Sequence, residues 1–257
     1  MSVMSPRKIG RAIAEAFRLT ARPLAIYGSD TIPHGAEPVS SVNRCLAAAM
    51  YHLAVNNEHR SLYVGPDAKA ATCPGGLTHL GLIEYPASIK YFVSTGSAGY
   101  HGGAAEFLKA TPEIVERCFR AMGKITTPAR NVVIQACDDL PDRAPDVLAI
   151  SLFGTAEQVR NLGALVHFDR DEPFFPVIVP WGPVCSTLIT FPAGMAQNAP
   201  AKTAFMGPQD PTMNYALPAD TMALGVPISV AQRMAENIPL SFVARRTDVA
   251  FPERREV

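Results

Sequence analysis

"NVVIQACDD" (131–139) and "DVLAISLFG" (146–154) are two apolar runs in the middle of the chain. Both are rich in valine, isoleucine and other residues favoured in strands, so each predicts a buried strand. The segment after the second run, "TAEQVRNLGALVHF" (155–168), predicts a helix whose N-cap is Thr155. Strand and helix in direct succession are typical of an α/β or α+β fold.

The alternation continues on both sides of these runs. We expect one globular domain over residues 1–257, with a folded core at 7–245 and an exposed tail at 246–257. A mixed sheet with flanking helices fits this pattern, and two similar lobes are a second arrangement that it allows. The remaining predicted strands are 24–29, 60–66, 89–96, 202–207 and 221–227, and the remaining predicted helices are 7–17, 41–55, 73–82, 111–123, 185–191 and 229–239.

Charge and hydropathy limit the class of partner. The 23 basic and 23 acidic residues cancel, so no net field attracts nucleic acid or an anionic membrane. Residues 173–201 carry no charge, but prolines at 173, 176, 180, 183 and 192 interrupt them, which predicts buried irregular core and not a membrane span. A small-molecule substrate or ligand is therefore the expected partner, and a homo-oligomer stays open.

The five cysteines are spread widely and are odd in number, which predicts reduced thiols in the cytoplasm. One of them, Cys73, stands in "TCPGGLTHLGL" (72–82) at the expected start of a helix. There the helix dipole and unpaired N–H groups favour the thiolate, and Pro74 suits the first helical position. Gly75 and Gly76 leave space for a bulky group near the backbone. The alternative is that Cys73 is a small buried residue in a tight turn.

Four segments, in this order, resemble the domain-of-unknown-function family 169, a group of uncharacterised proteins frequent in anaerobic bacteria and archaea. They are "NRCLAAAMYHLA" (43–54), the Cys-Pro-Gly-Gly segment above, "FVSTG" (92–96) and "GPVCSTLITFPAGM" (182–195). The similarity runs from about Pro23 to about Pro239, and it implies family cysteines at Cys45, Cys73 and Cys185. Many relatives carry a Cys-Gly-x-Arg-like segment where this chain has "MGPQDPT" (206–212), so a fourth cysteine ligand is missing here.

Three cysteines from separate elements suggest an iron–sulfur cluster, of the 4Fe–4S type, with Cys45, Cys73 and Cys185 as ligands. One iron would then stay open as a Lewis acid for a non-redox reaction on a small molecule, as in lyases of the aconitase type. On this hypothesis Arg44 and His79 bind substrate and transfer protons, and Gly75 and Gly76 approach the cofactor.

Other interpretations of the same residues remain open. Zinc could be held by the three cysteines with His52 or His79, although no closely spaced ligand pair is present. Cys73 could act as a nucleophile with His79 or His101 as its base. A non-catalytic accessory protein that binds a small ligand, or handles sulfur or metal, is the alternative from another class. Trp181, near Cys185, is expected in the wall of an apolar pocket or in the core.

Overall fold

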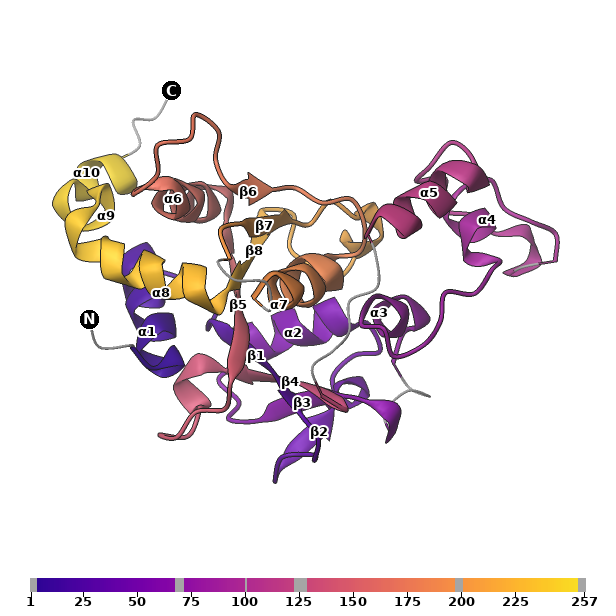
Figure 1. Ribbon diagram of the computed structural model, residues 1–257, viewed down its shortest axis with the longest axis horizontal. Coiled ribbons are helices and arrows are strands. Elements are labelled where there is room, and N and C mark those ends of the chain that lie inside the picture. Colours follow the sequence, from indigo (N-terminus) through magenta and orange to yellow (C-terminus); the bar gives the residue numbers. More distant parts are fainter. Residues whose placement is uncertain (1–3, 68–71, 100, 123–128, 197–200, 254–257) are drawn as a thin grey trace.

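The computed structural model describes residues 4–67, 72–99, 101–122, 129–196 and 201–253 (Figure 1). In these residues a single mixed sheet has the strand order β2-β3-β4-β1-β5-β8-β7-β6, which confirms the α/β class. The strands are β1 (Leu24–Ser29), β2 (Ala36–Pro38), β3 (Ser61–Val64), β4 (Asn131–Ala136), β5 (Val147–Thr155), β6 (Val177–Ile178), β7 (Ala204–Gly207) and β8 (Thr221–Pro227).

The strand order is symmetric about the central β1–β5 pair. In the first half β1 pairs with β4, β4 with β3, and β3 in parallel with β2. In the second half β5 pairs with β8, β8 with β7, and β7 in parallel with β6. β1 and β5 are antiparallel neighbours and join the two halves. The chain therefore builds the same four-stranded unit twice, which is the arrangement of two similar lobes within one sheet.

Helices cover both faces of this sheet. The helices of the described residues are α1 (Pro6–Phe17), α2 (Leu46–Val55), α3 (Pro74–His79), α4 (Ile89–Val93), α5 (Pro112–Met122), α6 (Ala156–His167), α7 (Phe191–Ala196), α8 (Ile228–Asn237), α9 (Phe242–Arg245) and α10 (Thr247–Ala250). One core layer lies between the sheet and α1, α6 and α8. The other contains α2, part of α3 and the helical turn 186–190 that leads into α7. Figure 1 shows α4 and α5 projecting away from the sheet.

Side chains alternate between the two core layers along each central strand. On β1, Leu24 and Ile26 face the layer of α2, while Ala25 and Tyr27 face the layer of α1. Because both faces are covered, the central strands are apolar at almost every position, and this explains why 131–136 and 147–153 were recognisable as buried strands. The predicted N-cap of α6 is also confirmed, since Thr155 and Gln158 form a reciprocal capping box.

Two predicted elements differ in the structure. The strand predicted at 89–96 is instead the helix α4, which packs on α5 and not on the sheet. A short apolar run such as "IKYFV" has too few residues for its periodicity to separate strand from helix. The helix predicted to end at Phe191 instead continues to Ala196, since the helical turn 186–190 leads directly into α7.

The C-terminal tail predicted at 246–257 and the end of the helix predicted at 111–123 can be compared with the structure only in part. The expected exposed tail contains α10, and its last residue, Ala250, is buried and accepts a hydrogen bond from the Asn161 side chain. The predicted end of the 111–123 helix at Gly123, and residues 254–257 of the tail, lie outside the described residues. Within the described part of the chain, no helix is both long enough and apolar enough to cross a bilayer.

The close contact of β8 with the turn 186–190 gives a stability prediction. A Cβ added at Gly225 would clash with the Thr187 carbonyl and crowd Pro192, so Gly225→Ala should lower the free energy of unfolding by about 1–3 kcal/mol. Gly163, inside α6, has only Val177 Cγ2 near, at 3.8 Å, so Gly163→Ala should raise it by about 0.5–1 kcal/mol. Urea unfolding measures both variants, and equal stability of the two would contradict the packing described here.

Candidate functional site

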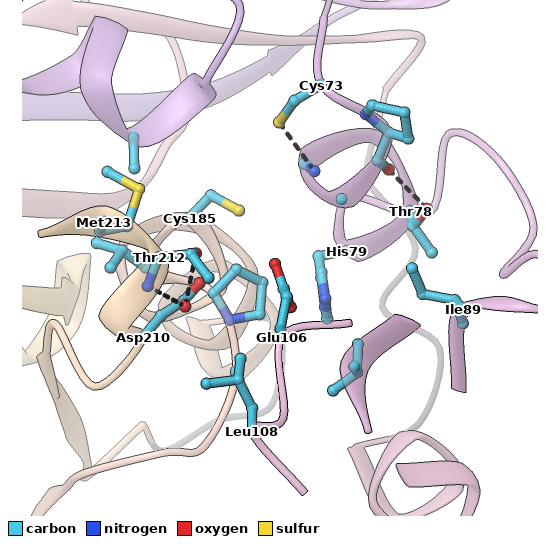
Figure 2. Close-up of a pocket in the computed structure, with 18 of the residues that line it drawn as sticks. Cys73, Thr78, His79, Ile89, Glu106, Leu108, Cys185, Asp210, Thr212 and Met213 are labelled. Atoms are coloured by element: carbon cyan, nitrogen blue, oxygen red, sulfur yellow. Dashed lines mark hydrogen bonds between the residues drawn. The ribbon is translucent and has the colours of Figure 1, made fainter. Parts of the chain in front are cut away.

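A cavity of about 660 Å³ lies where the connections of the two lobes meet (Figure 2). Its wall includes Cys45, Cys73 and Cys185, which are 28 and 112 positions apart in the sequence. Apolar and aromatic side chains from α4, α5 and the segment 181–184 form a further part of the wall. The three cysteines singled out by the sequence therefore share one site.

Cys45 and Cys185 occupy equivalent positions in the two lobes. Cys45 is the N-cap of α2, in the crossover that joins the parallel strands β2 and β3. Cys185 precedes the helical turn 186–190, in the crossover between the parallel strands β6 and β7. Both crossovers pack on the same face of the sheet, so the repeated topology brings these two sulfur atoms to one cavity.

Cys73 and Asp210 form a second equivalent pair. Each follows the third strand of its lobe, each is followed by a proline, and each caps a short helical segment. The Gly76 N–H donates to Cys73 Sγ at 3.3 Å, and the Thr212 N–H donates to Asp210 Oδ1 at 3.0 Å. Both side chains line the cavity, so the second lobe presents a carboxylate where the first presents a thiol.

Cys73 is the most acidic thiol of the site. A hydrogen bond from the Cys45 thiol and the Gly76 N–H lower the pKa of Cys73 to about 6. The same interaction raises the pKa of Cys45, whose Sγ also donates to Met213 Sδ at 3.5 Å. The Cys73 N–H donates to the Arg44 carbonyl at 2.8 Å, which fixes the segment beside α2. At neutral pH the pair therefore carries one negative charge, on Cys73.

Cys185 is a thiol at neutral pH. It is 4% exposed, and burial raises its pKa, with smaller contributions from the charges of Cys73 and Asp210. The turn that follows it is anchored by two hydrogen bonds: Ser151 donates to the Leu188 carbonyl at 2.8 Å, and Thr190 donates to the His79 carbonyl at 3.2 Å. The second bond ties the second lobe directly to the end of α3.

His79 is a neutral imidazole in this cavity, because burial lowers its pKa to about 4. Its Nδ1 lies 2.9 Å from the Tyr85 hydroxyl, and burial raises the pKa of Tyr85 to about 12. Tyr85 stacks on Phe119 with ring centroids 4.4 Å apart, and Phe119 lies 5.8 Å from Trp181. These rings form an aromatic wall. Trp181 belongs to this wall, as in the first of the two places expected for it, the wall of a pocket or the core.

The structure also shows two acidic groups that the sequence reasoning missed. Glu106 points into the cavity, and burial together with the charge of Asp210 raises its pKa to about 7 (Figure 2). Glu106 belongs to no recognisable motif. Asp210 could have been found, because Gly-Pro at 65–66 and again at 207–208 precedes Cys73-Pro74 and Asp210-Pro211 in the same order.

The other residues named from the sequence divide into two groups. His79, Gly75 and Gly76 line the cavity with the three cysteines. A Cβ at Gly76 would lie 3.1 Å from Cys73 Sγ, whereas one at Gly75 would meet nothing within 4 Å. The Arg44 side chain is exposed and is not among the lining residues. Arg44 is linked to the site through its carbonyl, which accepts the hydrogen bond from the Cys73 N–H.

The two histidines of the alternative hypotheses do not join the described site. His52 is not among the lining residues, and the side chain of His101 lies outside what the structure describes. Cys118, on α5, and Cys137, which is buried behind β4, are also absent from the lining. All five cysteines are free.

The donor set of the cavity suits a soft metal group better than a single ion. Within the described ranges, no three His, Cys, Asp or Glu side chains are arranged to hold one metal ion. The zinc hypothesis therefore lacks a closed ligand set. An iron–sulfur cluster is larger and takes each thiolate on a different iron atom, so three cysteines placed around a cavity are compatible with it.

The fold and cavity define a two-lobed α/β protein with a thiol-lined site. The chain belongs to the DUF169 family, described as an uncharacterised ArCR family, which it matches over residues 12–237. This confirms the resemblance drawn from the cysteine segments. No curated protein and no solved structure matches the chain.

The hydrogen bonds at Cys73 predict its reactivity in the metal-free protein. Since the thiolate is the nucleophile, alkylation by iodoacetamide should rise with a midpoint near pH 6, and Cys73→Ala should abolish this phase. Gly76→Ala crowds the sulfur and should move the midpoint upward, while Gly75→Ala should leave it unchanged. A midpoint near 9.0, the ordinary thiol value, would contradict the geometry.

Glu106 predicts a pH-dependent contribution to stability. Its pKa is raised from 4.5 to about 7 on folding, so its favourable contribution is complete below about pH 4.5 and is lost as the pH rises through about 7. Glu106→Gln removes the charge, so the variant should match the wild type near pH 4 and exceed it near pH 8 by roughly 1 kcal/mol, allowing for solvent screening of a half-buried group. Urea unfolding across this range measures the difference; a variant less stable than the wild type at about pH 8 would contradict it.

Proposed function

We propose that the chain is an iron–sulfur protein in which Cys45, Cys73 and Cys185 bind a 4Fe–4S cluster beside the cavity. The single observation that carries the proposal is the convergence of three thiols from three distant elements on one cavity. Cys73 is already ionised near neutral pH, which reduces the number of protons that a metal group must displace. Three protein thiolates leave one iron of such a cluster without a cysteine ligand.

As the activity of this site we propose a non-redox reaction on a small molecule bound in the cavity. A bound cluster would supply a Lewis acid there. His79 is neutral and can accept a proton, and Glu106 has a pKa near 7, where a side chain is suited both to donate and to accept. We assign no role to the Arg44 side chain, because it is not among the residues that line the cavity.

Compartment and partner follow from the same residues. Because all five cysteines are free, we place the protein in a reducing compartment, the cytoplasm. The partner that we propose is a small molecule of a size suited to a cavity of about 660 Å³.

Anaerobic reconstitution with iron and sulfide tests the cluster. We expect a brown protein with broad visible absorbance and about four irons per chain. Cys45→Ala, Cys73→Ala and Cys185→Ala should each lose most of the colour and iron, whereas Cys118→Ala, on α5 and outside the lining, should retain them. A colourless, iron-free wild type, or equal losses in the Cys118 and Cys73 variants, would reject the proposal.

A non-catalytic ligand-binding or sulfur- and metal-handling protein is the second candidate. The observation that favours it is the cavity itself, whose volume and largely apolar wall are those of ordinary small-molecule pockets. The two candidates differ in the reconstitution experiment, since only the first predicts iron that depends on all three cysteines.

A further inference from the structure

Acidic side chains face the cavity, and no cationic side chain lines it in the described part of the chain. Among the described residues that line it are two carboxylates, Glu106 and Asp210, but no lysine or arginine. Figure 2 shows Glu106 between the Asp210 side and the His79 side of the site. Because the wall is mostly apolar, charges facing it are poorly solvated and favour a partner of opposite sign.

Neither carboxylate is neutralised by a basic side chain in the described part of the chain. The hydrogen bonds that hold Asp210 come from the Thr212 N–H and hydroxyl, and both end on Oδ1. Glu106 is held through its backbone, whose N–H donates to the Phe92 carbonyl at 2.8 Å, and its carboxylate faces the charge of Asp210 across the site. When both acids are ionised they repel each other, and a cation between them relieves this repulsion.

The aromatic part of the wall suits an organic molecule. Tyr85, Phe119 and Trp181 form a continuous aromatic surface, and aromatic faces attract cations. Lys109, which is not a lining residue, already places its Nζ 4.4 Å from the centroid of the Trp181 ring. This contact shows that the wall accommodates an ammonium group against its outer ring.

We infer that the cavity binds a small organic cation, with an ammonium group between Glu106 and Asp210 and an apolar or aromatic body against Tyr85, Phe119 and Trp181. A substrate that carries a carboxylate would instead meet these two acids, with no cation among the described lining residues to receive it. The inference goes beyond the proposed cluster, because it depends only on the charges and rings of the cavity.

Trp181 is the only tryptophan of the chain, so its fluorescence reports on the cavity. The protein, purified without added iron, is titrated at about pH 7.5 with three probes of similar shape: 2-phenylethylammonium, 2-phenylethanol and 3-phenylpropanoate. We expect the cation to bind at least about tenfold more tightly than the anion, with the neutral probe between them.

Variants then assign the selectivity to the two acids. Glu106→Gln and Asp210→Asn should each weaken the cation by about fivefold, and the Asn side chain retains the cap on Thr212. Asp142→Asn, whose carboxylate is fully exposed far from the lining, should change nothing and controls for net charge. Circular dichroism and thermal unfolding confirm that each variant is folded.

Three results would overturn the inference: no response to the cation, an anion that binds as tightly as the cation, or unchanged cation affinity in both acid variants. None of them bears on iron binding. A protein that selects the cation but takes up no iron rejects only the cluster, and one that takes up iron without selecting the cation rejects only the organic-cation site.

Discussion

The antiparallel pairing of β1 with β5 is the constraint on which the rest of the structure depends. It joins two four-stranded units of the same topology edge to edge, so that their parallel crossovers pack on one face of a common sheet. Each crossover has a cysteine at its helical start, and the pairing places those starts around one cavity. A hydrogen bond from Thr190 to the His79 carbonyl then ties the lobes together at the rim of the site.

The repeat explains both the symmetry of the site and its departure from symmetry. Cys45 and Cys185 are equivalent, and so are Cys73 and Asp210, but the last pair differs in chemistry. A thiolate is a soft ligand, whereas a carboxylate is hard and suits cations of another kind. The cavity thus presents both thiols and carboxylates, which is the reason for assigning a metal group to the former and an organic cation to the latter.

The three cysteines share the cavity but differ in pKa, which is lowered for Cys73 and raised for Cys45 and Cys185. Cys73 receives hydrogen bonds from a thiol and a backbone N–H, so its negative charge is stabilised. Cys185 is deeply buried beside that charge and keeps its proton. Each further thiolate would add repulsion in a poorly solvated place. Ionisation of all three thiols therefore requires a positively charged group to be bound among them.

The sequence by itself determined the elements that are long or well capped. Buried strands at 131–136 and 147–155, the capped helix after Thr155 and the cysteine at the start of α3 follow from local pattern, since side-chain periodicity and capping depend on neighbours in the chain. The short run at 89–93 was wrongly predicted as a strand, because so few residues carry no decisive periodicity, and in the structure it is a helix packed on α5. Only the tertiary structure decided that Glu106 and Asp210 face one cavity and that Cys185 joins Cys73 there. Those relations join residues about a hundred positions apart, and it is the pairing of the two lobes, not any local pattern, that brings such residues together.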